Sequence, residues 1–191
     1  MNKFLQNLIF SFTKPPIVVI FGPGCDFLIK MISHILGEEK KILMICADSN
    51  YNKDNLQYLV EKSSLPILAF LENNISPALS NILGLIKDFP GKGFIISDKN
   101  FSNFKKIKNE AQCRVFTFGL LGEANIFATD INFTEEGTNF KINYAGHIVP
   151  FWIKKKISEK EINDLMAAVL ISALNGMNLV EISQSLKNFD F

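Results

Sequence analysis

Hydrophobic positions in the first 120 residues come in short continuous runs, and each run is followed by a stretch with helical spacing. The runs are rich in Val, Ile, Leu and Phe, which is typical of strands buried on both faces of a sheet. Between them, apolar residues recur at intervals of three and four, which indicates amphipathic helices. The pattern predicts strands at 17–21, 41–46, 65–71, 93–97 and 114–118, and helices at 25–36, 55–62, 77–88 and 101–111.

Near residue 124 the pattern changes to alternation of apolar and polar residues. Turn signals at Glu136-Gly137 and Ala145-Gly146 predict a three-stranded antiparallel meander over 124–153. Helical spacing returns over 158–189, where Ser158 and Glu161 form a capping box and Asn175-Gly176 separates two helices. We expect an α/β fold: a mostly parallel sheet with helices on both faces over 15–120, then the meander, then the helix pair.

A length of 191 residues suits one domain, which we assign to 15–191. Residues 1–14 are expected to form a short amphipathic helix that packs on this domain; docking on a partner or a membrane surface is the alternative. Its apolar part is too short to span a bilayer and precedes no cleavage site, so we expect neither a transmembrane segment nor a signal peptide.

The formal net charge of +1 gives no reason to expect nucleic acid as a partner. Arg114 is the single arginine, which nearly excludes bidentate phosphate clamping. Cys25, Cys46 and Cys113 are odd in number and lack close pairing, which argues against a disulfide framework or a zinc site. We therefore expect a reducing, cytoplasmic location.

The stretch "IVVIFGPGCDF" has the strand–loop–helix layout in which backbone N–H groups and a helix N-terminus cradle phosphate. Gly22, Gly24, Cys25 and Asp26 are therefore candidate residues of a vestigial phosphate loop. Pro23 removes one N–H donor from it. The alternative is a structural turn in which Asp26 caps the following helix, and we favour that interpretation. Cys25 beside the helix start could have a lowered pKa, but the sequence identifies no histidine partner for a nucleophile.

Several other polar residues could lie at the carboxyl ends of strands, where open α/β sheets bind ligands, or in solvated loops: Asp48, Asp54, Glu72 and Asp98. Right-handed crossovers would bring Gly22, Asp48, Asn73 and Ser97 to the same edge of the sheet. His34 and His147 lack a second His or Cys at ligand spacing, so we expect structural roles and no metal site. The run Lys154-Lys155-Lys156 reads as a solvated strand end, with an anionic partner as the alternative.

The order of motifs along the chain resembles the central domain of the Mur ligases, the ATP-dependent peptide ligases of cell-wall synthesis. "CRVFTFGLLGEANIFATDINFTEEGTNF" is similar to that family's "TFG" strand, "DI" strand and "DGT.F" hairpin, and Met166-Ala167-Ala168 lies in the position of its Ala-rich helix. "LPILAFLENNISPAL" is similar to "PDIAVLTNISPDHL", and "PPIVVIFGPGCDFLIKMISHIL" has the frame of "P.VIAITGTNGKTT...I..IL". The resemblance implies a P-loop-like fold for residues 15–189.

The chain departs from this family at the residues that bind ATP and Mg²⁺ in these ligases. In the alignment Asp26 stands at the phosphate-binding lysine and Phe27 at the first Mg²⁺-binding threonine. A carboxylate repels a triphosphate where the lysine would attract it. Ala78-Leu79 replace the family's Asp-His pair, and the "NADD" motif is reduced to Ser97-Asp98-Lys99-Asn100. The chain also covers neither the N-terminal UDP-substrate domain nor the C-terminal domain of these ligases.

The resemblance and its departures imply a Mur-ligase-like central domain that has lost ATP and Mg²⁺ binding, with no catalytic residues and no cofactor. We expect a non-catalytic binding or scaffold protein that forms a homo-oligomer or binds a protein partner, such as a cell-wall ligase. The alternatives are an ATP-dependent amide ligase or one half of a split ligase with a divergent nucleotide site, and a small module that senses anions or nucleotides through Gly22–Gly24.

Overall fold

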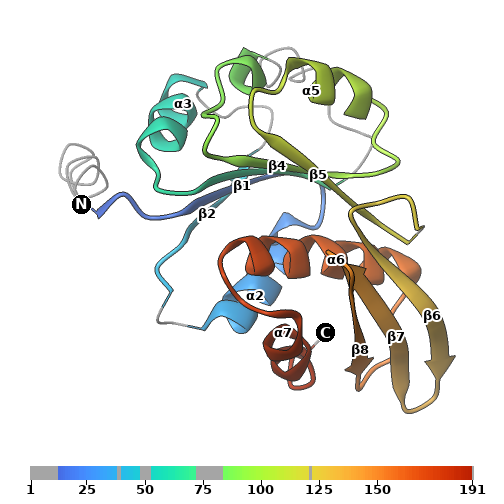
Figure 1. Cartoon of the computed structure of the whole chain (residues 1–191). Coiled ribbons are helices and arrows are strands. Elements are labelled where there is room, and N and C mark those ends of the chain that lie inside the picture. The colour runs from blue at the N-terminus through green and yellow to red at the C-terminus, as the bar shows by residue number, and fades with distance from the viewer. Residues whose placement is uncertain (1–12, 38–39, 48–52, 72–83, 121, 191) are drawn as a thin grey trace.

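The computed structural model describes residues 13–37, 40–47, 53–71, 84–120 and 122–190, and these form one eight-stranded sheet with helices packed on it (Figure 1). The strand order is β2-β1-β3-β4-β5-β6-β7-β8. The strands are β1 (Ile17–Phe21), β2 (Leu43–Ala47), β3 (Pro66–Phe70), β4 (Phe94–Asp98), β5 (Arg114–Gly119), β6 (Ile126–Thr134), β7 (Gly137–Tyr144) and β8 (His147–Ile153).

The predicted parallel core is confirmed. Strand β1 pairs in parallel with β2 on one side and β3 on the other, and the parallel pairing continues through β4 and β5. All five residues of β1 and of β3 are buried, as their continuous apolar runs predicted. Because the strands are parallel and in register, Phe21, Phe70 and Ser97 lie in one row near their carboxyl ends.

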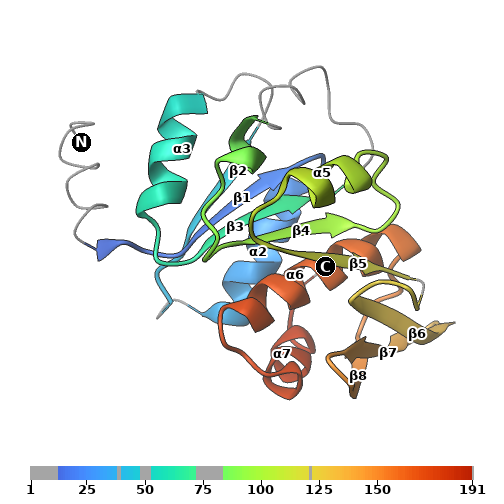
Figure 2. The same ribbon diagram turned by 45° about the horizontal axis from the view of Figure 1, so that its top comes forward.

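Helices cover both faces of this core (Figures 1 and 2). One face carries α2 (Cys25–Leu36), α6 (Glu159–Leu174) and α7 (Leu179–Leu186), and the other carries α3 (Lys53–Lys62) and α5 (Phe104–Glu110). Alternate residues of β1 serve the two layers. Val18 and Ile20 belong to the apolar cluster of α2, α6 and α7, and Val19 belongs to the cluster of α3 and α5.

Helix α5 begins three residues later than predicted, because the segment after β4 forms hydrogen-bonded turns. The Asn100 N–H donates to Asp98 Oδ1, and the Phe101 N–H donates to the Asp98 carbonyl. Of the helix predicted at 77–88, residues 84–87 are helical and residues 77–83 lie outside the described residues. The helix predicted at 1–14 lies almost wholly outside the described residues as well.

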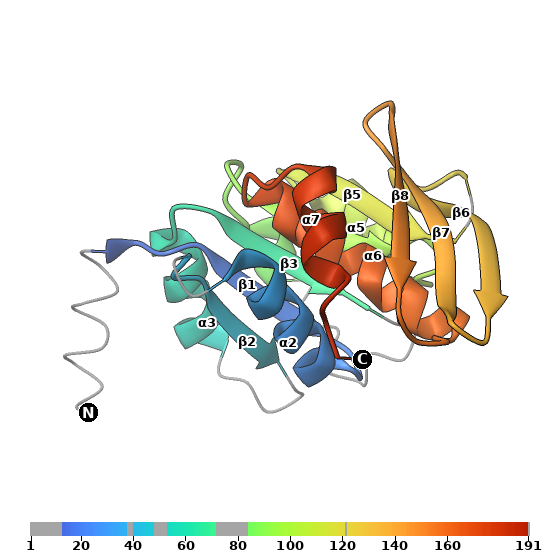
Figure 3. The ribbon, with the colours of Figure 1, turned by 90° about the horizontal axis from the view of Figure 1, so that it is seen from below.

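The predicted antiparallel meander is confirmed, and it continues the sheet instead of forming a separate layer. Strand β6 runs parallel to β5 through Phe118 and Gly119, and β7 and β8 then pair antiparallel. Asn125 stabilises the junction, because its Oδ1 accepts both the backbone N–H and the hydroxyl of Thr117. Figure 3 shows these three strands beside α6, on the face of the molecule that also carries α2 and α7.

One hairpin turn was predicted at the wrong residues. Ala145 and Gly146 form the second turn with positive φ angles, as expected, but the first turn is made by Glu135 and Glu136. Gly137 is instead the first residue of β7, where it lies against β8. A Cβ at this position would collide with the Ile153 carbonyl oxygen and lie 2.8 Å from Trp152 Nε1. The glycine is therefore needed for close backbone approach.

Strand β8 is the end strand of the sheet. Ile148 is 64% exposed and Trp152 is 43% exposed on it. Pro150 lies at its middle, opposite Lys141 of β7, and the hydroxyl of Ser183 from α7 donates to the Pro150 carbonyl oxygen. Helix α7 therefore covers part of this end of the sheet.

The first C-terminal helix begins and ends as predicted, whereas α7 ends at Leu186, before the predicted end near residue 188. Ser158 Oγ accepts the Glu161 N–H, and the Glu161 carboxylate accepts the Ser158 N–H, which completes the capping box of α6. Gly176, with φ of 90°, follows the end of α6, and a second capping box starts α7. Within the described ranges, no helix is both long enough and apolar enough to cross a membrane.

Candidate functional site

The glycine loop joins β1 to α2 as predicted. Gly22 and Gly24 have φ angles of 121° and 87°, a conformation that residues with a Cβ rarely adopt. Helix α2 begins directly afterwards, at Cys25, and its first helical hydrogen bond runs from the Leu28 N–H to the Gly24 carbonyl. The predicted order of strand, glycine loop and helix is therefore confirmed.

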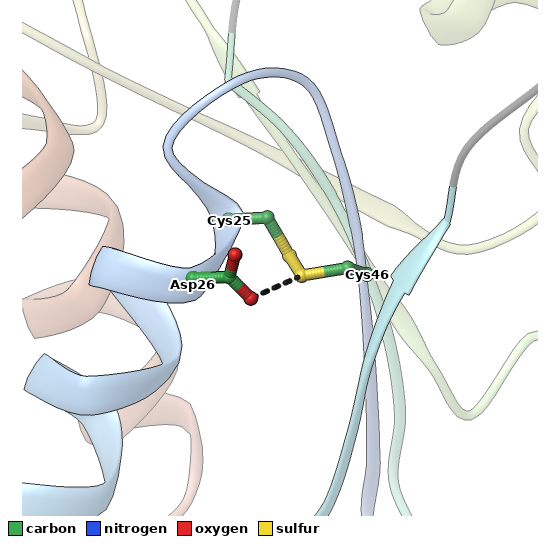
Figure 4. The surroundings of a disulfide bond; sticks show 3 residues. All are labelled: Cys25, Asp26 and Cys46. Atoms are coloured by element: carbon green, nitrogen blue, oxygen red, sulfur yellow. Dashed lines mark hydrogen bonds between the residues drawn. A yellow bond between two sulfur atoms is a disulfide. The ribbon is translucent and has the colours of Figure 1, made fainter.

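The prediction that the cysteines are unpaired is wrong for two of the three. Cys25, at the start of α2, forms a disulfide with Cys46, near the end of β2, with their Cα atoms 5.8 Å apart (Figure 4). The pairing follows from the parallel register of β1 and β2, which places Cys46 opposite Ile20, five residues before Cys25. Cys113 is free, and burial raises its pKa to about 11.

Asp26 is exposed in the first turn of α2, where a negative charge meets the positive end of the helix dipole. Its Oδ1 lies 3.7 Å from the Cys46 sulfur (Figure 4). The N-cap residue of α2 is Gly24, and no side-chain hydrogen bond caps the helix there, so the predicted capping by Asp26 is not observed. The location of Asp26 instead places its carboxylate beside the disulfide.

A second carboxylate lies against the loop from α6. Asp164 is only 5% exposed, and its Oδ2 lies 3.6 Å from the point that a Cβ on Gly24 would occupy. A buried carboxylate requires hydrogen-bond or charge partners. The carboxyl group of this α6 residue therefore lies against the glycine loop.

The residue next to Asp164 connects α6 to the end of β4. Asn163 Nδ2 donates to Asp98 Oδ2 at 2.6 Å, while Asp98 Oδ1 accepts the Asn100 N–H at 2.7 Å. Both carboxylate oxygens of Asp98 are thus engaged within the protein. Lys99, the next residue, forms an ion pair with Glu123.

Of the residues predicted to meet at one sheet edge, Gly22 and Ser97 do so: Gly22 directly follows Phe21 of β1, and Ser97, the next-to-last residue of β4, lies in the same row as Phe21. Asp48, Glu72 and Asn73 lie outside the described residues. Asp54 lies in the first turn of α3, on the opposite face of the sheet from α2. Asp98 is therefore the strand-end carboxylate that the structure connects to α6.

The histidines lie away from the glycine loop. His34 Nε2 contacts the Ser185 carbonyl at 3.0 Å, and its ring packs edge-on against Phe189, so it connects α2 to α7. His147 is exposed beside the hairpin turn that precedes β8. Over the described ranges, no group of three or more His, Cys, Asp or Glu side chains could hold a metal ion.

Sequence reasoning missed Asn163 and Asp164. The available signal was a pair of polar residues directly before the apolar run "LMAAVLISAL" of a helix whose other buried positions are mostly aliphatic. Their partners, Asp98 and the Gly24 loop, are far away in sequence, so the signal does not identify what they contact.

No protein-family model matches the chain. Solved structures similar to it include MurF ligase from Thermotoga maritima in complex with ADP, at a TM-score of 0.76 and 10% identity, covering 98% of this chain and 51% of that one. A second is UDP-N-acetylmuramoylalanyl-D-glutamyl-2,6-diaminopimelate--D-alanyl-D-alanyl ligase from Acinetobacter baumannii. Its TM-score is 0.74 at 14% identity, and the match covers 97% of this chain and 47% of that one. A third is the UDP-N-acetylmuramate:L-alanyl-gamma-D-glutamyl-meso-diaminopimelate ligase from Neisseria meningitides. Its TM-score is 0.72 at 13% identity, and the match covers 97% of this chain and 70% of that one.

The present chain spans about half the length of the first two of these ligases. The structural match covers nearly all of this chain, so it includes the parallel core, the antiparallel strands and the C-terminal helices. At sequence identities of 10–14%, the structural match shows a similar fold and does not show a similar activity. The chain has the fold of the central domain of the Mur ligases.

Proposed function

We propose that this chain is a non-catalytic binding or scaffold domain that uses the Mur ligase central-domain fold without binding ATP and Mg²⁺. The observation that carries the proposal is the position of Asp164, whose buried carboxylate lies against Gly24 in the loop where a phosphate would have to bind. An acidic side chain at this place offers a phosphate no positive charge and lies directly against the backbone of the loop.

Two side chains of α2 support the same conclusion. Asp26 adds a second carboxylate at the start of the helix, at the position that the resemblance assigns to the phosphate-binding lysine. Phe27, at the position assigned to the Mg²⁺-binding threonine, packs its ring 5.9 Å from that of Phe189 near the C-terminus. The first turn of α2 therefore offers negative charge and an apolar contact where nucleotide binding needs a cation and a hydroxyl.

A scaffold role requires a partner, and we propose a second copy of the chain or a cell-wall ligase in the cytoplasm. The similar solved structures are ligases that act on UDP-N-acetylmuramoyl compounds according to their names, which is the reason to name that process. Exposed apolar side chains suited to a protein contact include Ile148 and Trp152 on β8 and Val180 on α7.

Isothermal titration of the full chain with ATP·Mg²⁺, and separately with ADP, tests the loss of nucleotide binding. We expect no heat of binding with either. A dissociation constant in the micromolar range would contradict the proposal and favour a ligase with a divergent site. The variant Asp26→Lys/Phe27→Thr/Asp164→Ala should gain weak binding, because it introduces the cation and the hydroxyl and removes the buried carboxyl group.

Light scattering of the full chain, compared with variants lacking residues 1–12 or 188–191, tests association with a second copy. We expect a dimer that one of the two truncations converts to a monomer. Co-purification with individually expressed cell-wall ligases tests the heteromeric form. A chain that is monomeric at tens of micromolar and binds none of these ligases would contradict the scaffold role, whatever the result with ATP.

A further inference from the structure

The Cys25–Cys46 pair joins the first residue of α2 to the end of the neighbouring strand β2 (Figure 4). We propose that this pair is a reversible thiol–disulfide site, which exchanges with a low-molecular-weight thiol of the glutathione class and sets whether the glycine loop is covalently tied to β2. The inference does not depend on whether the domain binds nucleotide.

The sheet itself keeps the two cysteines together in both redox states. Strand β2 pairs with β1 at five consecutive positions, including Ile20 with Cys46 and Phe21 with Ala47. Cys25 follows Phe21 after only the Gly22–Gly24 loop. Breaking the sulfur–sulfur bond leaves this backbone pairing in place, so the two thiols stay close and the disulfide can form again without refolding.

The two sulfur atoms have different surroundings, and this difference assigns their roles. Cys46 is exposed on β2, whereas Cys25 is 8% exposed. An incoming thiolate therefore reaches the Cys46 sulfur first. Cys25 lies at the N-terminus of α2, where the helix dipole stabilises a thiolate, and a stabilised thiolate is a good leaving group in exchange.

Asp26 reinforces this asymmetry. Its Oδ1 lies 3.7 Å from the Cys46 sulfur, so its charge disfavours a thiolate on Cys46. After reduction the same oxygen is placed to accept the Cys46 S–H. The carboxylate also repels an approaching thiolate anion, which slows the exchange without blocking it.

The exchange balances in two steps. A thiolate RS⁻ attacks the Cys46 sulfur, the Cys25–Cys46 bond breaks, and the products are a mixed disulfide R–S–S–Cys46 and the Cys25 thiolate. A second RS⁻ attacks the R sulfur, releases the Cys46 thiolate and leaves RSSR. Two thiols are oxidised to one disulfide, the protein gains two electrons, and its two thiolates take protons from solvent. The reverse reaction uses RSSR as the oxidant.

The test uses the full chain with Cys113→Ser, so that free thiols report on this pair alone. The folded protein is equilibrated with reduced or oxidised glutathione, acid-quenched, alkylated with N-ethylmaleimide and weighed by intact mass spectrometry. We expect two alkyl groups after excess reduced glutathione and none after oxidised glutathione, from either starting state. A pair that stays oxidised in excess reduced glutathione, or stays reduced in oxidised glutathione, would overturn the proposal.

Rapid quenching during reduction tests the assigned route. Peptide mapping should place glutathione on Cys46 and the alkyl group on Cys25; the opposite placement would overturn the assignment. Asp26→Asn should accelerate reduction by about fivefold at low salt, because it removes a unit charge near 4 Å from the attacked sulfur. Asp88→Asn, a matched change at an exposed turn after residues 84–87, should leave the rate unchanged. Equal rates for both variants would contradict the role of Asp26.

Discussion

Asp98 and Asn163 are 65 positions apart in the sequence, yet the Asn163 amide donates a 2.6 Å hydrogen bond to Oδ2 of Asp98. The bond connects the carboxyl end of β4 to α6, a helix that follows all eight strands in the chain. The neighbouring residue, Asp164, lies against Gly24 in the loop after β1. Consecutive residues of α6 therefore contact the end of β4 and the glycine loop.

Replacing Asn163 tests this connection. Asn163→Ala leaves one oxygen of the Asp98 carboxylate without its partner, and hydrogen bonds to charged groups contribute about 1.5–3 kcal/mol. We expect the free energy of unfolding to fall by about that amount in urea titrations. Asn109→Ala, at an exposed position of α5, is the matched control and should change it by less than about 0.5 kcal/mol. Equal effects of the two substitutions would contradict the importance of the bond.

Gly137 and Gly146, both in the meander, allow two matched glycine-to-alanine substitutions to be compared. Both have positive φ angles, but an added Cβ would collide with the Ile153 carbonyl at Gly137 and would meet nothing within 4 Å at Gly146. Gly146→Ala should therefore cost only the conformational strain, about 1 kcal/mol. Gly137→Ala should cost more than about 3 kcal/mol, because β7 and β8 must separate. Trp152, the single tryptophan, lies beside Gly137 and reports the change by its fluorescence.

The capping box of α6 predicts a dependence of stability on pH. The backbone N–H of Ser158 holds the pKa of Glu161 below its ordinary value of 4.5, although partial desolvation acts in the opposite direction. A lowered pKa in the folded state means that the stabilisation is present above pH 4.5 and is lost as the pH falls through the folded value.

Glu161→Gln keeps an acceptor for the Ser158 N–H and removes the charge. At pH 7 it should reduce the free energy of unfolding by less than about 1 kcal/mol, because solvent screens this partly exposed group. The difference from the unmodified chain should shrink as the pH falls below 4.5, because the stabilisation is lost as the glutamate is protonated in the folded state. A difference that is the same at pH 7 and pH 3 would show that the charge contributes nothing.

The Cys25–Cys46 disulfide closes a loop between positions 21 apart, and loops of that size contribute about 3 kcal/mol by restricting the unfolded chain. We expect Cys46→Ser to lose about this much stability compared with the oxidised chain, since its exposed position accepts a serine. The two proteins should unfold alike in excess dithiothreitol. Cys113→Ser is the control that leaves the loop closed.

Much of the fold could be predicted because its signals are local. The buried strands β1 and β3, the capping box at Ser158 and the end of α6 before Gly176 each depend on residues close together in sequence. The turn near Gly137 was predicted at the wrong residues because the signal there depends on a residue distant in sequence. Its glycine is required by β8, a strand that begins ten residues later, and not by the turn itself.

The candidate site was only partly predictable. The glycine loop and Asp26 were found, because a strand, a loop and a helix follow each other directly. The disulfide was missed, since cysteines 21 positions apart match no spacing motif, and only the register of β1 with β2 brings them together. Asp164 was missed because its partner at Gly24 is 140 positions earlier in the chain, and no local pattern encodes that contact.

Pro150 limits how copies of this protein can aggregate. The end strand of a sheet exposes backbone groups on which a strand of another molecule can add, and repeated addition produces fibres. Pro150 has no N–H to offer at the middle of β8, and its carbonyl oxygen already accepts the Ser183 hydroxyl. A copy that approached β8 would find the row of backbone hydrogen bonds interrupted at its centre. Growth of the sheet from molecule to molecule is therefore blocked at this end, even though Ile148 and Trp152 on the same strand are exposed.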